Sequence, residues 1–183
     1  MKAVFSAVQL GHAPKRFLSK GEIVPYPDSP DRARALLEGA RQAGASIHAA
    51  RRFDPEVLES VHSPEYLAFL KSAHEEWRKI EGASSDLMPS LRPMMPVLHE
   101  PEHILALAGR YMMDFSCAIT KNTWSSALAS AMTAMTAADL VNKGEPVAYA
   151  LCRPPGHHAY GSRRGVLLSE QYGTGRRAAS GIP

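Results

Sequence analysis

The chain has 183 residues, of which 45% are hydrophobic, and its formal net charge is +3 from 21 basic and 18 acidic residues. Removing the four bases and one acid that follow residue 162 leaves 17 of each sign in residues 1–162, so the excess belongs to the last stretch alone. This composition allows one domain with a sizeable core, and it argues against nucleic-acid or membrane binding through a basic surface.

Targeting and membrane signals are not visible. No stretch approaches the roughly 20 apolar residues of a membrane span, and the N-terminus lacks the pattern of a cleaved signal peptide. Cys117 and Cys152 lie in apolar surroundings without the spacing of metal ligands, which favours buried thiols in a reducing compartment. We therefore expect a cytoplasmic protein.

In chain order, the sequence predicts a strand at residues 3–5, an irregular loop at 17–27 and a weak strand at 45–49. A side chain able to cap a helix precedes proline at three places, which predicts helices ending near residues 44, 61 and 80: Ser29–Pro30, Asp54–Pro55 and Ser63–Pro64. The third helix carries an apolar stripe that we expect to face the core: Tyr66, Phe69, Leu70, Ala73 and Trp77.

Residues 81–102 are rich in proline, glycine and serine, so regular structure is not expected there. Such a loop is either functional or a simple linker. Thr123 is predicted to cap an alanine-rich helix that ends near Asn142 and packs on a sheet. Residues 147–152 then read as a strand buried on both faces of a parallel sheet.

The segment RPPGHHA, residues 153–159, follows that strand. Its two prolines stiffen the backbone, and Gly156 allows the turn that would bring His157 and His158 to one site. Paired imidazoles suit proton transfer near neutral pH. The alternative is a pair of surface loop histidines.

RPPGHHA resembles the signature of the zinc-dependent histone deacetylase superfamily, and the N-terminal part is most similar to its acetylpolyamine amidohydrolase branch. The likeness extends to MKAVFS at 1–6, PDRA at 30–33, VHSPEYLAFL at 61–70 and NTW at 122–124. The resemblance implies an α/β fold, a three-layer parallel sheet of the arginase/deacetylase type truncated to its N-terminal part. It also implies hydrolysis of N-acetyl amides, with acetylated polyamine or acetyl-lysine as substrate.

Residue roles follow from the same resemblance. His157 corresponds to an electrostatic or general-acid group and His158 to the general base. Arg32 corresponds to an arginine of the channel through which acetate leaves, and Gly156 lies at the same channel; the alternative for Arg32 is an ordinary solvated arginine. Residues 81–104 correspond to an insertion that joins two subunits, which suggests a homodimer.

The family pattern stops after the histidines. A GGFCYLNN-like segment, three zinc ligands and a catalytic tyrosine should follow, and residues 163–183 contain none of them. Codons allowed for residues 163–177 encode AGGFCYLNNTALAA when read one nucleotide later. We therefore expect a family domain at 1–162, a disordered out-of-frame tail at 163–183, no bound zinc and no activity in this chain alone. The alternative is a noncatalytic dimerising module or a nonfunctional gene product.

Overall fold

The computed structural model describes residues 1–90, 99, 101–112 and 117–155. Its centre is a parallel sheet of three short strands in the order β4-β1-β5. The strands are β1 (Lys2–Phe5), β4 (Ser46–Ala49) and β5 (Ala148–Ala150). The middle strand has the small, fully buried side chains that a central position requires, since Ala3 and Val4 have no exposed surface. The strands predicted at residues 3–5 and 45–49 are confirmed.

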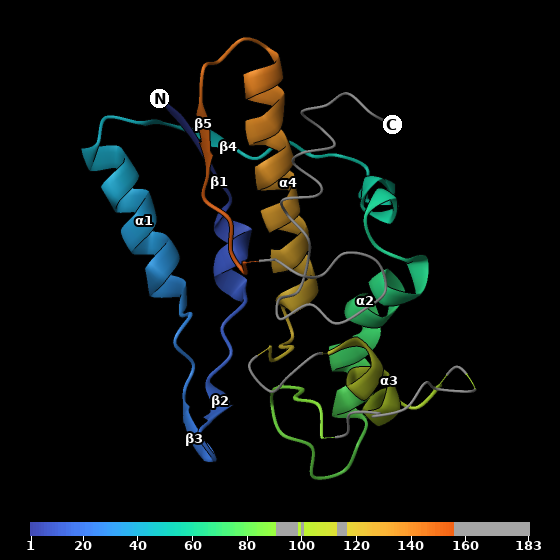
Figure 1. The fold of residues 1–183 in the computed structure, drawn as a ribbon. Helices are drawn as coiled ribbons and strands as arrows, with labels where there is room; N and C mark the ends of the chain where they lie inside the picture. Colours follow the sequence, from blue (N-terminus) through green and yellow to red (C-terminus); the bar gives the residue numbers. More distant parts are fainter. Residues whose placement is uncertain (91–98, 100, 113–116, 156–183) are drawn as a thin grey trace.

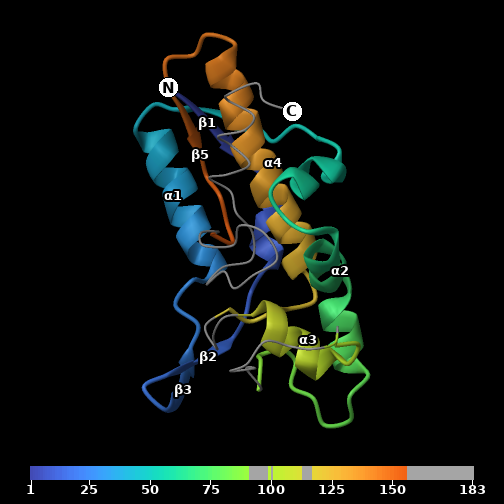
Figure 2. The same cartoon turned by 45° about the vertical axis from the view of Figure 1, so that its right-hand side comes forward.

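Helices cover both faces of this sheet. Helix α1 (Pro30–Gln42) lies on one side and the long helix α4 (Thr123–Asn142) on the other, as Figures 1 and 2 show from two directions. Beneath α1, Ala3, Ala40 and Leu151 form a buried apolar cluster. The layers of helix, sheet and helix confirm the predicted three-layer α/β architecture.

The predicted capping residues begin their helices. The Ser29 hydroxyl accepts a hydrogen bond of 3.3 Å from the amide of Asp31, and the Ser63 hydroxyl accepts one of 3.3 Å from the amide of Tyr66 at the start of α2 (Pro64–Arg78). Asp54 caps in the same way, but the segment that follows is the 3₁₀ helix η2 (Pro55–Ser60). Each cap satisfies an amide that the first helical turn leaves unpaired.

A second core forms where α2 packs against α3 (Ile104–Tyr111). The predicted apolar stripe of α2 is buried there, and the rings of Phe69 and Tyr111 pack against each other at a tilt, with centroids 5.0 Å apart. The described part of the 81–104 segment is tied to this core, because Trp77 donates to the carbonyl of Ser84 at 2.8 Å and the fully buried Leu87 pairs with Ile119. Residues 81–90 are therefore not a simple linker.

Some predictions were wrong. Residues 17–27 include an antiparallel hairpin of β2 (Arg16–Ser19) and β3 (Glu22–Pro25), which was missed because neither strand has a buried face. Helix α3 was also missed, because His103, an unusual cap, accepts the amide hydrogen bond of Leu105 at its start.

Two further boundaries differ from expectation. Thr123 is the first residue of α4 rather than its cap, and its hydroxyl serves contacts outside the helix. The strand predicted at 147–152 is shorter, and Tyr149 is 38% exposed, so burial on both faces was wrong in the described structure. Of the helices in the described ranges, none has both the length and the apolar composition needed to cross a bilayer.

Candidate active site

The carboxyl end of β5 leads into a buried turn formed by Cys152, Arg153 and Pro154. The Ser130 hydroxyl of α4 donates a hydrogen bond of 3.2 Å to the carbonyl of Pro154, and the Cys152 thiol donates one of 3.4 Å to the carbonyl of Ser130. These contacts attach the first half of the RPPGHHA segment to α4. The other predicted site residues of this segment, Gly156, His157 and His158, lie outside the described residues.

Arg153 is the most heavily bonded residue of the turn, and only 2% of it is exposed. Its Nη1 atom donates to the carbonyl of His12 at 2.5 Å and to that of Gln9 at 3.2 Å, and its Nη2 atom donates to the carbonyl of Asp28. Its Nε atom lies 3.3 Å from Oδ2 of Asp28. Arg153 therefore joins the end of β5 to two loops that come more than a hundred residues earlier in the chain.

Gln9 completes this attachment from the 3₁₀ helix η1 (Ala7–Gly11), which directly follows β1. Its side chain has no exposed surface. Its Oε1 atom accepts the backbone N–H of Arg153, and its Nε2 atom donates to the carbonyl of Ser6 and the hydroxyl of Thr133, both at 3.2 Å. Because every polar atom of the amide has a partner, burial of Gln9 does not leave an uncompensated polar group.

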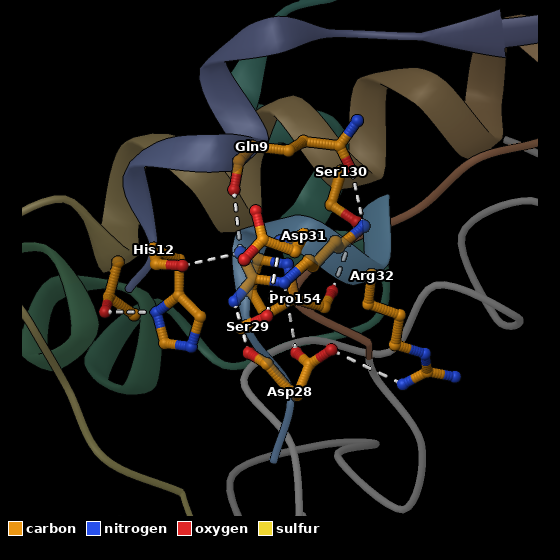
Figure 3. A network of polar contacts seen from close by, with 10 residues as sticks. Gln9, His12, Asp28, Ser29, Asp31, Arg32, Ser130 and Pro154 are labelled. Atoms are coloured by element: carbon orange, nitrogen blue, oxygen red, sulfur yellow. Dashed lines mark hydrogen bonds and ion pairs between the residues drawn. The ribbon is translucent and has the colours of Figure 1, made fainter. Parts of the chain in front are cut away.

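Asp28 is the carboxylate of the site, and its side chain is 15% exposed. Figure 3 shows it below Pro154, with a dashed line to the guanidinium group of Arg32. One oxygen, Oδ1, lies 3.4 Å from Nη1 of Arg32, and the other, Oδ2, faces Arg153. Burial lowers the pKa of Arg153, and the charge of Asp28 opposes that shift. Since a guanidinium does not lose its proton in proteins, the carboxylate is shared by two cations.

His12 is a buried neutral histidine beside this group. It is 1% exposed, and its Nδ1 atom lies 2.8 Å from the hydroxyl of Thr123, which also accepts the amide of Thr120 at 2.8 Å. Desolvation, with a smaller contribution from the charge of Arg153, lowers the pKa of His12 to about 3. The imidazole is therefore uncharged near neutral pH, and it serves as a hydrogen-bonding group.

A cavity of about 50 Å³ lies beside the turn. Its lining includes the charged side chains of Arg32, Arg153 and Asp28. The rest of the lining is Cys152 and four apolar residues: Ala33, Leu36, Leu151 and Pro155. By volume it has room for roughly three or four water molecules or a molecule of about four heavy atoms, but not for a polyamine chain. Small anions fit this chemistry, because cationic and apolar groups line the same space.

Of the sequence-predicted residues, the structure therefore places Arg32 at this cavity, with a side chain that remains 62% exposed. The sequence reasoning missed the roles of Gln9, His12, Asp28 and Arg153. Arg153 stood inside the recognised motif, directly after a strand, and that position was the available signal. Within the described ranges, no group of three or more His, Cys, Asp or Glu side chains could hold a metal ion.

Comparisons with known proteins agree on one family. An acetylpolyamine amidohydrolase of Burkholderia pseudomallei is 35% identical over 160 residues, which are 87% of this chain and 46% of that protein. Another, of Mycoplana ramosa, is 34% identical over 161 residues, which are 87% of this chain and 47% of that protein. This chain thus spans about half the length of the curated relatives it matches.

The fold agrees as well. The crystal structure of an acetylpolyamine aminohydrolase from Burkholderia pseudomallei matches with a TM-score of 0.91 and 32% identity, covering 99% of this chain and 53% of that one. A histone deacetylase domain is recognised over residues 26–165. Because that match covers well over half of the sequence, the chain belongs to the histone deacetylase family.

Proposed function

We propose that this chain is the N-terminal part of a zinc-dependent deacetylase that hydrolyses the N-acetyl amide of an acetylated polyamine. The turn after β5 carries the proposal: Arg153 and Pro154 are held by three separate segments, and the histidine pair follows them in the sequence. The names of the relatives support acetylated polyamine ahead of acetyl-lysine as the substrate class.

The residues of this chain have distinct proposed tasks. His158 accepts a proton from the water that attacks the acetyl carbonyl, and His157 stabilises developing charge or returns a proton to the leaving amine. Acetate, the second product, then meets Arg32 at the cavity beside the turn, where a guanidinium can bind a carboxylate through paired hydrogen bonds. Gly156 is proposed to belong to the same product channel as Arg32.

Zinc belongs to the proposed function of the whole protein rather than to the part described here. The described residues do not fit a zinc site, because no cluster of suitable ligands occurs among them. We therefore assign no step of the reaction to a metal held by this chain, and we expect the chain alone to bind no catalytic zinc and to have no deacetylase activity.

We also infer that residues 163–183 are translated in a shifted reading frame. Two observations support this. The recognised histone deacetylase domain ends at residue 165, and codons permitted for residues 163–177 encode the expected family continuation one nucleotide later. On this proposal, residues 1–162 are the family part of the chain.

A hybrid protein tests the proposed function. Residues 1–159 would be joined to the C-terminal half of the Burkholderia pseudomallei relative, and hydrolysis of N-acetylputrescine and of an acetyl-lysine peptide would be compared, with and without a zinc chelator. We expect chelator-sensitive turnover that favours the acetylated polyamine, and none from the 183-residue chain. A folded hybrid that hydrolyses neither substrate would show that the proposed function is wrong.

A homodimer through residues 81–104 is a second proposal. It is favoured by the anchoring of residues 84–87 to the α2–α3 core and by an open cavity of about 470 Å³ beside Phe69, Ile80 and Ile104. Sedimentation of the purified chain tests it. A discrete dimer that Ile80→Asp dissociates is expected, whereas a monomer at all concentrations would exclude it.

A further inference from the structure

The cavity beside the β5 turn is lined by more positive than negative charge. Among the described residues that line it, Arg32 and Arg153 are cationic and Asp28 is anionic. The positions of the two cations differ, because Arg153 is buried with both terminal nitrogens bonded to loop carbonyls, whereas Arg32 has a side chain that is 62% exposed. Arg32 is therefore the cation that remains available to a small anion.

Asp28 connects these two arginines through different oxygens. Oδ2 lies 3.3 Å from Nε of Arg153, and Oδ1 lies 3.4 Å from Nη1 of Arg32. The carboxylate comes two residues before α1 begins, and Arg32 is in the first turn of that helix, so the contact with Arg32 spans one helical turn. One carboxylate thus offsets part of the charge of both guanidinium groups.

We propose that Asp28 sets the affinity of this cavity for small carboxylates, by offsetting part of the positive charge of Arg32 and Arg153. The inference rests on the proposed function, in which acetate is a product that must bind briefly and leave. With Asp28 ionised, the three groups sum to one positive charge; without it, they sum to two. A cavity with two positive charges retains acetate, and product release becomes slow.

The size and lining of the cavity agree with this assignment. A volume of about 50 Å³ accepts acetate, which has four heavy atoms, and excludes an acetylated polyamine. Ala33 and Leu36 of α1 are apolar parts of the lining that can contact a methyl group. Asp28 therefore acts on a bound anion through the charge of the two arginines that it faces.

Acetate binding to the full 183-residue chain provides the test, since it requires no turnover. Titration of [2-¹³C]acetate followed by NMR, at constant ionic strength with chloride as the counterpart, would give the dissociation constant. We expect saturable binding that Arg32→Gln abolishes and that Asp28→Asn tightens on the order of tenfold. Asp28→Glu, which keeps the charge, should bind acetate like the unaltered chain.

Matched controls come from the same helix. Asp31 pairs with Arg34 at 2.6 Å, and both side chains are largely exposed away from the cavity. Asp31→Asn changes the net charge as Asp28→Asn does, and Arg34→Gln changes it as Arg32→Gln does. Both controls should leave acetate binding unchanged. Equal effects of the two aspartate variants would show only a general response to net charge and would overturn the proposal, as would acetate binding that survives Arg32→Gln.

The buried partner requires one more variant, because Asp28→Asn leaves Arg153 without its counter-charge and can unfold the chain. The double variant Asp28→Asn/Arg153→Met removes the buried pair together, which proteins tolerate better than loss of one partner. It returns the cavity to one positive charge, so acetate should bind within about threefold of the unaltered affinity; a change of tenfold or more would overturn the proposal. An inactive hybrid would refute the proposed function while leaving these binding results standing.

Discussion

Asp28 and Arg153 meet across 125 positions of sequence, with Oδ2 of the aspartate 3.3 Å from Nε of the arginine. This contact joins the loop before α1 to the turn after β5, and both segments lie at the carboxyl end of the parallel sheet. Ligand sites of open α/β sheets form at this end. The pair therefore shapes the place where the family motif begins, and its removal has measurable consequences.

Arg153→Met should destabilise the chain by about 3 to 5 kcal/mol, because it leaves the Asp28 carboxylate and three loop carbonyls without their buried donor. Urea denaturation followed by circular dichroism measures this free energy. Arg41→Met is the matched control, since Arg41 is exposed and lies 3.8 Å from Glu38. It should change stability by less than about 0.5 kcal/mol. Equal effects of the two substitutions would contradict the described network.

Protonation of His12 should destabilise the folded chain at acidic pH. Its pKa is about 3 in the folded chain, against the ordinary histidine value of 6.5 when unfolded, so between these limits the unfolded state binds the extra proton. The stability associated with neutral His12 is therefore fully present above pH 6.5. It is lost as pH falls toward 3, at up to about 1.4 kcal/mol per pH unit.

Comparison with His12→Asn isolates this contribution, because the amide can replace the bond to Thr123 but does not titrate. Urea denaturation at pH 7, 6 and 5 gives the stability difference between the two proteins at each pH. The advantage of the unaltered chain should shrink as pH falls. A difference that is constant from pH 7 to pH 5 would mean that His12 is not held neutral by the fold.

The β2–β3 hairpin offers a stabilising substitution. Its two-residue turn places Lys20 at φ 52° and Gly21 at φ 84°, and only the second residue is suited to that region. Lys20→Asn should stabilise the chain by roughly 0.3 to 1 kcal/mol, since asparagine tolerates this backbone better than lysine. Lys20→Ala removes the same charge without that tolerance. A gain of equal size from alanine would assign the effect to charge instead.

The coding DNA provides a test of the frameshift. We expect the codons for residues 163–177, read one nucleotide later, to encode a segment close to AGGFCYLNNTALAA. Resequencing of the gene from genomic DNA would give this directly. Codons that encode no such segment in either neighbouring frame would remove the proposal, and residues 163–183 would then be the genuine continuation of this protein.

Local signals in the sequence were sufficient for much of the fold. Ser29 and Ser63 mark their helices because a cap and the following proline act within three residues. The hairpin at residues 16–25 lacked such a signal, since its exposed strands show no burial pattern. Arg153, Gln9 and His12 were not recognised as one network because their contacts join positions 141 to 144 residues apart. Contacts between residues so far apart in the sequence are set by the tertiary fold.

We propose that the histidines that follow Pro155 in the sequence transfer protons in amide hydrolysis. The most direct measurement is kcat/KM of the hybrid protein for N-acetylputrescine, compared among His157→Ala, His158→Ala and the control His48→Ala, whose histidine lies in β4. We predict that His158→Ala lowers kcat/KM by about 10² to 10⁴, that His157→Ala lowers it by a smaller factor, and that the control stays within about twofold. Unchanged kcat/KM in both His157→Ala and His158→Ala would contradict the claim.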